Sequence, residues 1–397
     1  MRDVYIAAPC RTGVGSFGGT LGATPASVLG TAVIRDALSR AKVSPSDVDQ
    51  VLLGNVLQAG QGQNPARQAA LGAGIPVEVP AMTLNKVCGS GLTAVSLAAA
   101  LIRAGEAECI IAGGMENMSL APYYLPQLRK GARMGDVKVV DGMVQDGLWD
   151  VFANYHMGIT AENVAEKYGV SRAEQDGFAY LSQQKAAKAA NAGRFEAEIT
   201  PVEIPGKKGA VTVFRSDEYI RMDASREKMA SLSPAFKPNG TVTAANASGI
   251  NDGAAAMLVV SGDFLREKDI VPMAKYVAGA SCGVEPSLMG MGPVPSVQKL
   301  LQKAGLQVSD IDLFEVNEAF ASQSIAVCRE LRLDMARVNV NGGAIAIGHP
   351  IGASGARITV SLLHEMKMRA ERYGVSTLCI GGGMGEAALF ERDAICR

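Results

Sequence analysis

Residues 34–55 read IRDALSRAKVSPSDVDQVLLGN, and residues 297–318 read VQKLLQKAGLQVSDIDLFEVNE. Each stretch has apolar residues at the spacing of one helix face, then a turn containing Ser-Asp-Val-Asp or Ser-Asp-Ile-Asp, then an apolar strand. The two stretches align without a gap. The same supersecondary unit therefore occurs twice in the chain.

Both copies continue with an apolar segment, a glycine-rich turn, a helix and a strand. In the first copy these are Ala81–Val87, Cys88-Gly-Ser-Gly91, an Ala-rich helix ending near Arg103, and Glu108–Ala112. In the second copy they are Val338–Asn341, a turn with Ala353-Ser-Gly355, a helix ending near Arg372, and Ser376–Ile380. Repeated strand–helix–strand units predict an α/β fold in which helices cover a parallel or mixed sheet.

The segment between the two copies has a different composition. It is richer in Met, Tyr and charged residues, and it predicts a loop domain over 119–244, inserted between residues 1–118 plus 245–268 and residues 269–397. From Pro205 to Gly240 it carries seven Lys or Arg and four Asp or Glu. This stretch is either a solvated loop or the mouth of a site for a phosphorylated ligand, because Arg and Lys bind phosphate oxygens well.

Composition excludes several functional classes. The 397 residues carry a net charge of −1, so nothing in the charge balance favours nucleic acid or an anionic membrane. The seven cysteines are odd in number and lack the spacing of a zinc site, so we expect neither a disulfide framework nor a metal centre. The N-terminal residues lack a signal-peptide pattern, and a cytoplasmic protein is the expectation.

Two residues stand out as a nucleophile and a base. Cys88 lies where a strand turns into a helix, and the partial positive charge and free N–H groups of a helix N-terminus favour a thiolate. A Cys-Gly-Ser-Gly turn by itself is equally compatible with an inert structural thiol. His349 lies in a rigid Gly- and Pro-rich loop that a substrate can approach, whereas His364 follows Ser-Leu-Leu on a helix and is typical of packing.

Further candidates lie at predicted strand ends. Cys379 ends an apolar strand and precedes a Gly run that includes Gly381, whose backbone N–H groups are free to approach an anion. Asn317 follows the strand predicted at Leu313–Val316. Since sites in parallel sheets gather at the carboxyl ends of strands, we expect Cys88, Asn317 and Cys379 to converge.

Four segments resemble the signatures of thiolases in sequence, order and spacing. They are Leu84–Gly91 (LNKVCGSG), Asn317–Phe320 (NEAF), Asn341–Arg357 (NGGAIAIGHPIGASGAR) and Cys379–Gly385 (CIGGGMG). The resemblance covers essentially the whole chain. Within the family, the sequence is most similar to the short-chain type, the acetyl-CoA acetyltransferases. It implies a duplicated αβαβαββ core of two similar halves in five layers, with a loop domain inserted late in the first half.

The resemblance also implies a chemistry. It implies a reversible, ping-pong Claisen condensation of two acetyl-CoA to acetoacetyl-CoA, in which Cys88 is acetylated, His349 takes its proton and Cys379 makes the carbanion. A water held by Asn317, together with His349, is expected to stabilise the enolate oxygen. The N–H groups of Cys88 and Gly381 are expected to stabilise the tetrahedral oxyanion. Coenzyme A is then a substrate, and neither a cofactor nor a metal is implied.

The resemblance places the remaining binding residues around these groups. It assigns the acyl pocket to His156, Met157, Met289, Ala319 and Phe320, and the pantetheine and nucleotide channel to Leu148, Arg221, Phe236, Ala244 and Ser248. Met157 and Met289 could instead pack in the core, and Ser248 could simply be a turn residue. The resemblance further implies a homo-oligomer, with Leu125–Met143 similar to the loop through which tetrameric members associate as a dimer of dimers.

Three other interpretations remain open. A ketoacyl synthase acting on acyl-carrier protein shares this core, but such enzymes usually pair Cys with two His or with His and Asn. A non-catalytic carrier is expected to lack Cys88, His349 or Cys379, and all three are present. A redox-sensing oligomer would use the thiols themselves, and acetylation of Cys88 by acetyl-CoA distinguishes it from an acyltransferase.

Overall fold

A sheet built from both halves of the chain organises the molecule. The computed structural model describes residues 2–206 and 209–396, so two lysines of the basic stretch, at 207 and 208, lie outside the described residues. The first half supplies β1 (Val4–Thr12), β3 (Gln50–Gly54), β4 (Ala81–Leu84), β5 (Cys109–Asn117) and β13 (Asn251–Ser261). The second half supplies β14 (Ala274–Gly283), β15 (Leu313–Val316), β16 (Tyr373–Ile380) and β17 (Met384–Glu391).

The two half-sheets join along β1 and β14. The strand order is β15-β16-β17-β14-β1-β13-β5-β3-β4, and β1 pairs with β14 through Tyr5 and Ile6. Within each half, β3 runs parallel to β5 and β15 runs parallel to β16, while β13 and β17 run antiparallel to their neighbours. The mixed sheet predicted from the repeat is therefore confirmed.

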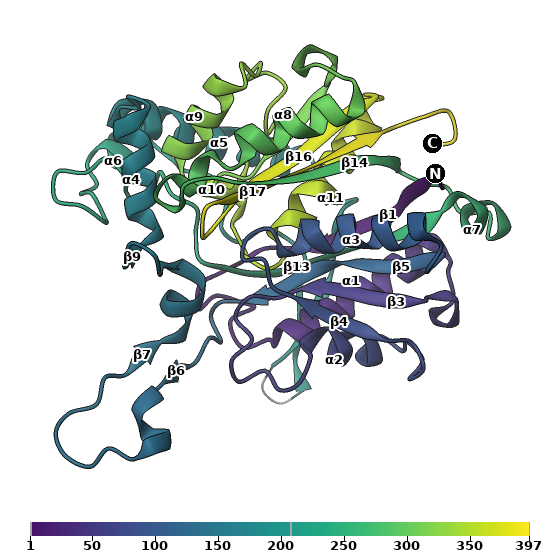
Figure 1. Cartoon of the computed structure of the whole chain (residues 1–397), viewed down its shortest axis with the longest axis horizontal. Coiled ribbons are helices and arrows are strands. Elements are labelled where there is room, and N and C mark those ends of the chain that lie inside the picture. Colours follow the sequence, from purple (N-terminus) through teal and green to yellow (C-terminus); the bar gives the residue numbers. More distant parts are fainter. Residues whose placement is uncertain (1, 207–208, 397) are drawn as a thin grey trace.

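Helices alternate with the half-sheets in five layers (Figure 1). Helices α1 (Ala26–Ala41) and α2 (Pro65–Gly72) cover the outer face of the first half-sheet. Helices α8 (Pro293–Ala304) and α9 (Ala321–Glu330) cover the outer face of the second. Between the half-sheets lie α3 (Ser90–Ala104) and α11 (Ser354–Arg369), whose apolar side chains form one continuous core with both.

The repeat corresponds to equivalent elements. Helix α1, the 3-10 turn Pro45–Asp47 and β3 match α8, the 3-10 turn Val308–Asp310 and β15 in the same order. The duplicated α/β core is confirmed. The stretch Val87–Ala104 is long and apolar enough to cross a membrane by composition alone, but it contains α3, which packs between the two half-sheets as a core helix.

Several predicted segments have different bounds in the structure; β16, for example, begins at Tyr373 rather than Ser376. β4 ends at Leu84 rather than Val87, because Asn85 accepts a hydrogen bond from the Val87 N–H and Val87 adopts a left-handed φ of 48°. β5 continues to Asn117 because its pairing with β13 extends that far. The apolar segment at Val338 pairs with β15 through one bridge only.

The helices α3 and α11 meet at their N-termini through glycines of the two copies. A Cβ on Gly91 would lie 2.8 Å from the backbone nitrogen of Ala356, and a Cβ on Gly355 would lie 2.5 Å from that of Leu92. Backbone atoms cannot give way at such distances, so only glycine permits this approach. The close packing places the turn before each helix, one with Cys88 and one with His349, next to the other.

The segment predicted as an inserted loop domain also contains helices, two of them of 11 and 20 residues. Helices α4 (Met157–Lys167), α5 (Arg172–Asn191) and α6 (Arg226–Ala230) lie at one end of the second half (Figure 1). The strands β6 (Tyr123–Tyr124) and β7 (Val140–Asp141) form the base of an arm that extends away from the body.

Candidate active site

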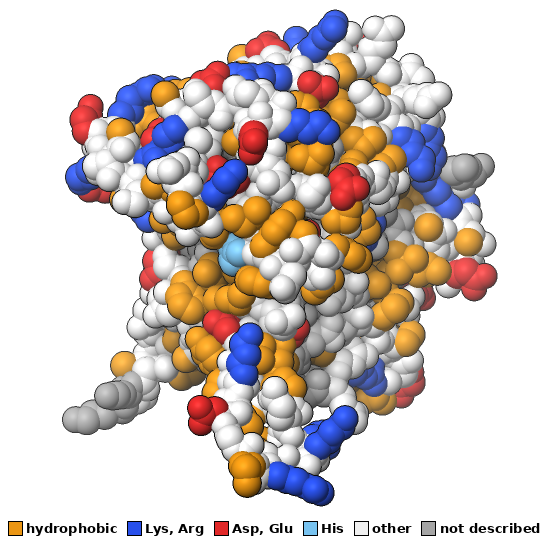
Figure 2. Space-filling view, turned by 60° about the vertical axis from the view of Figure 1, so that its left-hand side comes forward, with side chains coloured by type: hydrophobic (Ala, Val, Ile, Leu, Met, Phe, Trp, Pro, Cys, Tyr) orange, Lys and Arg blue, Asp and Glu red, His pale blue; other side chains and the backbone are white. Residues whose placement is uncertain are grey.

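A cavity of about 480 Å³ lies at the strand ends where the candidate residues were expected. Cys88, His349, Cys379 and Gly381 line it. On the face shown in Figure 2, apolar side chains surround a histidine, and the arm projects below them. The cavity thus brings two thiols and the imidazole of His349 together from segments of both halves.

Most of the predicted binding residues also line this cavity. They are Leu148, His156, Met157, Phe236, Ala244, Ser248, Met289, Ala319 and Phe320. Arg221 is not among the lining residues; it packs over the ring of Tyr219, which does line the cavity. Asn317 is fully buried behind the wall and touches His349 instead.

Sequence reasoning missed several lining residues. Phe17, Met118, Tyr219, Ile250 and Ile351 complete the walls. Ile351 lies inside the Asn341–Arg357 segment that resembles a thiolase signature, so that segment could have indicated it. Phe17 and Tyr219 lie in loops whose sequence gives no such indication.

The nucleophile candidate is partly exposed to the cavity but lies in apolar surroundings. Burial raises the pKa of Cys88 to about 11, although the backbone N–H groups of Gly381 and of Cys88 itself lower it. The expectation that the helix N-terminus would favour a thiolate in the resting protein is therefore wrong, because desolvation outweighs those donors. The same two N–H groups remain directed at the position of the reacting sulfur.

The loop that carries His349 is held by two side chains of the first half, Asn251 and Glu116. Its backbone N–H donates to Oδ1 of Asn251 on β13 at 2.9 Å, and Gly348 before it has a φ of 117°, which favours glycine. The buried carboxylate of Glu116 on β5 accepts the N–H of Gly352 at 2.8 Å and that of Val56 at 3.0 Å. The first half of the chain therefore positions a loop that belongs to the second.

His349 is neutral in the resting protein. Burial, and then the charge of Arg357, lower the pKa of His349 to about 3. A neutral imidazole has a free lone pair, so it can accept a proton at any pH near neutrality. The resting site therefore holds a thiol and a neutral base rather than an ion pair.

Asn317 contacts the ring of His349 from above. Its Nδ2 lies 3.5 Å from both Nδ1 and Nε2, which places the amide over the ring face rather than in the ring plane. Asn339 holds the backbone before it, since its side chain accepts from the Val316 N–H and donates to the Val316 carbonyl, each at 2.8 Å. Among the residues that the structure describes, Oδ1 of Asn317 has no partner, so it is available to a water.

The second thiol is fully buried. Burial, and then the proximity of Cys88, raise the pKa of Cys379 far above its ordinary range. The two sulfurs therefore sense each other's charge, and both are protonated at rest. Either one becomes a base only when its proton has been transferred to another group in the cavity.

The alkylation rate of Cys88 tests these protonation states. A thiol whose pKa is raised to about 11 is ionised to a small extent at pH 7, and only the thiolate reacts. We expect the logarithm of the iodoacetamide rate at Cys88 to rise with a slope of about one from pH 7 to beyond pH 9. Peptide mapping identifies Cys88 as the alkylated residue. An alkylation rate that reaches a plateau below pH 8 would contradict a raised pKa of Cys88.

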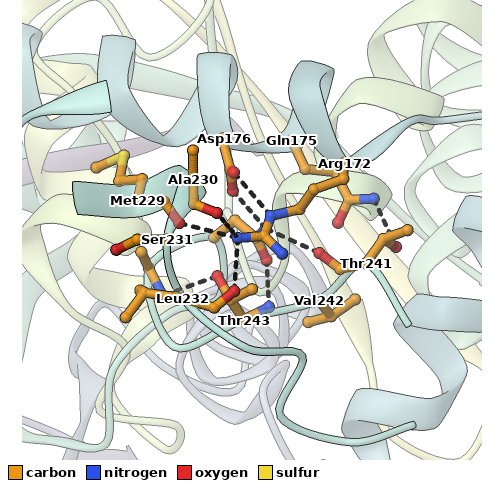
Figure 3. Close-up of polar contacts among 12 residues, drawn as sticks. Arg172, Gln175, Asp176, Met229, Ala230, Ser231, Leu232, Thr241, Val242 and Thr243 are labelled. Atoms are coloured by element: carbon orange, nitrogen blue, oxygen red, sulfur yellow. Dashed lines mark hydrogen bonds and ion pairs between the residues drawn. The ribbon is translucent and has the colours of Figure 1, made fainter. Parts of the chain in front are cut away.

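A network around α5 holds the loop that forms one wall of the cavity (Figure 3). Nη2 of Arg172 donates to the carbonyl oxygens of Met229 and Leu232, each at 2.9 Å, and its Nε donates to Asp176 at 2.7 Å. Asp176 in turn accepts from Nδ2 of Asn246 at 2.9 Å. The cavity residues Phe236 and Ala244 lie between these anchored points.

A larger cavity of about 670 Å³ lies between α5 and α9. Its walls are mostly apolar, with Lys185, Arg329 and Arg332 at the rim, and none of the predicted site residues lines it. Ser182 donates a hydrogen bond of 2.7 Å to Glu318 in its wall, but neither Cys88, His349 nor Cys379 lies there. The smaller cavity is therefore the candidate active site.

Family models match almost the entire chain. The thiolase N-terminal domain matches residues 4–263, and the thiolase C-terminal domain matches residues 270–392. Curated relatives include the acetyl-CoA acetyltransferase of Cupriavidus necator, 57% identical over 99% of this chain and 100% of that protein. The acetyl-CoA acetyltransferase of Pseudomonas aeruginosa is also 57% identical over 99% of this chain and 100% of that protein.

Solved structures agree in fold. The acetyl-CoA acetyltransferase of Bacillus anthracis is 43% identical, with a TM-score of 0.97 over 98% of this chain and 99% of that one. Human mitochondrial 3-ketoacyl-CoA thiolase in complex with CoA is 44% identical, with a TM-score of 0.95 over 99% of this chain and 98% of that one. One fold therefore accommodates proteins with two different substrate descriptions.

Proposed function

The chain belongs to the thiolase family, and from this premise we propose how its residues act. It is an acyltransferase that condenses two molecules of acetyl-CoA to acetoacetyl-CoA and CoA, or cleaves acetoacetyl-CoA in reverse. The observation that carries the proposed mechanism is that Cys88, His349 and Cys379 line one cavity. A single cavity allows one bound acyl group to meet all three.

The first half-reaction transfers an acetyl group to the protein. Cys88 loses its proton to His349 as its sulfur attacks the thioester carbon, because a neutral imidazole accepts the proton that the thiol cannot release to solvent. The N–H groups of Cys88 and Gly381 stabilise the tetrahedral oxyanion. The intermediate collapses to acetyl-Cys88, and the departing CoA sulfur takes the proton of Cys379.

The second half-reaction forms the carbon–carbon bond. The Cys379 thiolate removes a proton from the methyl group of a second acetyl-CoA, and protonated His349, with a water on Oδ1 of Asn317, stabilises the enolate oxygen. The enolate attacks acetyl-Cys88, and the carbon–sulfur bond breaks to release acetoacetyl-CoA. The Cys88 sulfur then recovers its proton from His349, so every group returns to its resting state.

We infer a preference for short acyl groups from the walls of the cavity. Met157, Met289 and Phe320 are buried around Cys379, and Phe236 packs edge-on against Phe320 with the ring centres 6.3 Å apart. These side chains leave little room beyond an acetyl or acetoacetyl unit. The full-length relatives at 57% identity described as acetyl-CoA acetyltransferases support the same preference.

Thiolysis rates with two substrates test this preference. We expect kcat/KM for acetoacetyl-CoA to exceed that for 3-ketohexadecanoyl-CoA by at least about tenfold, since the longer chain has to displace packed side chains. Release of acyl-CoA products measures both rates under the same conditions. Equal rates, or a higher rate on the long chain, would place the protein with the long-chain 3-ketoacyl-CoA thiolases.

We also propose that the arm associates with a second copy of the chain, giving a tetramer. Leu128, Met134 and Val139 expose 51%, 98% and 56% of their surface on the arm, and such exposure of apolar side chains is costly unless a partner covers them. We expect Met134→Asp to convert a particle of four chains into one of two. Light scattering measures the mass, with Met222→Asp, at an exposed site off the arm, as the control. A native particle that is not a tetramer, or a tetrameric Met134→Asp variant, would rule out this role.

A further inference from the structure

Ser354 forms the shortest polar contact of the His349 ring. Its Oγ lies 2.5 Å from Nδ1 of His349, and both residues are buried, with 0% and 5% of their surface exposed. Ser354 is also the first residue of α11, so its backbone is fixed by a helix that packs between the two half-sheets. The hydroxyl therefore holds a constant position relative to the ring.

The hydrogen of this hydroxyl is already committed. Oγ of Ser354 lies 2.9 Å from the carbonyl oxygen of Pro350, which can only accept. A hydroxyl has one hydrogen, and directing it to His349 would leave two lone pairs facing each other at 2.9 Å. The arrangement is satisfied when Ser354 donates to Pro350 and accepts from an Nδ1–H of His349.

The other ring nitrogen is then unprotonated. Nε2 has a polar contact of 3.5 Å with Nδ2 of Asn317, which lies over the ring face and does not occupy the in-plane lone pair. His349 lines the cavity that also contains Cys88. The lone pair that can take a proton is thus the one on Nε2.

We propose that Ser354 is a positioning residue that keeps His349 in the Nδ1–H tautomer and thereby leaves Nε2 free to accept the proton of Cys88. This inference rests on the proposed function of His349 as the base. The pair also remains bonded after the proton is transferred, because protonated His349 still donates from Nδ1 to Oγ. Without Ser354, a buried Nδ1–H would lose its acceptor, and the Nε2–H tautomer, which cannot take the proton, would become populated.

Nitrogen NMR of the resting protein tests the tautomer without any assay of activity. The chain has three histidines, His156, His349 and His364, so ¹⁵N-histidine labelling gives three ring patterns. The variants His156→Gln and His364→Gln assign them by loss of one pattern each. We expect His349 to show a protonated Nδ1 and an unprotonated Nε2, and the opposite pattern would overturn the proposal even if the protein is an active thiolase.

Substitutions at Ser354 test the consequence for catalysis. We expect Ser354→Ala to lower kcat and the rate of the acetylation burst by about ten- to a hundredfold, as removal of the hydrogen-bond partner of a metal-bound histidine typically does, with little change in KM. Ser354→Thr keeps the hydroxyl and should recover most of the loss. Ser361→Ala is the matched control, because Ser361 is a buried serine on the same helix that bonds to Glu198 at 3.1 Å.

The outcomes separate a positioning role from a structural one. Loss of the burst with a changed His349 spectrum in Ser354→Ala, and an unchanged spectrum and burst in Ser361→Ala, supports the proposal. Equal losses in the two alanine variants, or a native burst rate in Ser354→Ala, overturns it. If no acetyl-protein forms even in the native enzyme, the proposed function fails, and the tautomer measured by NMR still stands as a separate result.

Discussion

Replacing Cys88 with alanine should abolish condensation, thiolysis and labelling of the protein by radioactive acetyl-CoA. The expected loss is about 10⁴-fold or more, because the remaining site can bind substrate and polarise the carbonyl but has no atom to receive the acetyl group. The amount of acid-stable label recovered on the Cys88 peptide measures the first half-reaction directly. Steady-state assays of acetoacetyl-CoA formation and cleavage measure the whole cycle.

A matched cysteine separates this effect from general damage. Cys282 is also partly exposed but does not line the cavity, so Cys282→Ala should keep native label and activity. Thermal unfolding of both variants shows whether the fold is retained. Acetyl label that persists in the Cys88→Ala variant would mean that another residue is the nucleophile.

Replacing Cys379 with alanine should separate the two half-reactions. We expect condensation to fall by about 10²- to 10⁴-fold, the usual contribution of a positioned acid or base. Acetyl-Cys88 should still form, though more slowly, because a CoA thiolate can leave without first receiving a proton. The acetylated protein should accumulate, and intact-protein mass spectrometry detects the added acetyl group.

The contrast with His349 makes this prediction specific. His349→Ala should lose the acetylation step itself, since the thiol of Cys88, whose pKa is raised to about 11, then has no base. Acetoacetyl-CoA formation by Cys379→Ala at a near-native rate would exclude Cys379 as the carbanion base. Equal loss of both half-reactions would show that the two thiols do not divide the chemistry as proposed.

Local sequence patterns predicted the candidate residues Cys88, His349 and Cys379, but they did not predict the protonation states of these residues. The position of Asn317 after Leu313–Val316 was predictable because the repeat predicts a strand there, and β15 has those bounds. The position of Asn317 over the ring of His349 was not, since it depends on the packing of β15 against the loop before α11. The contribution of Ser354 was equally hidden, because its role depends on which atoms its hydroxyl faces.

The end of β5 and the surroundings of Arg221 both depend on residues that are distant in the chain. The extension of β5 to Asn117 follows from pairing with β13, which begins at Asn251 and belongs to a distant part of the chain. Arg221 was assigned to the binding channel by the family resemblance; it is exposed and packs over the ring of Tyr219, which lines the cavity. Both outcomes depend on partners that a window of neighbouring residues does not contain.

The sequence alone determined the duplicated architecture, the family and the identity of the two thiols and the histidine, because repeats and motifs are encoded by residues close together in the chain. Only the tertiary structure decided that Cys88 is a thiol with a raised pKa and that His349 is neutral. The physical reason is that burial and the field of groups such as Arg357 and Glu116 come from both halves of the chain, and they outweigh the local effect of a helix N-terminus.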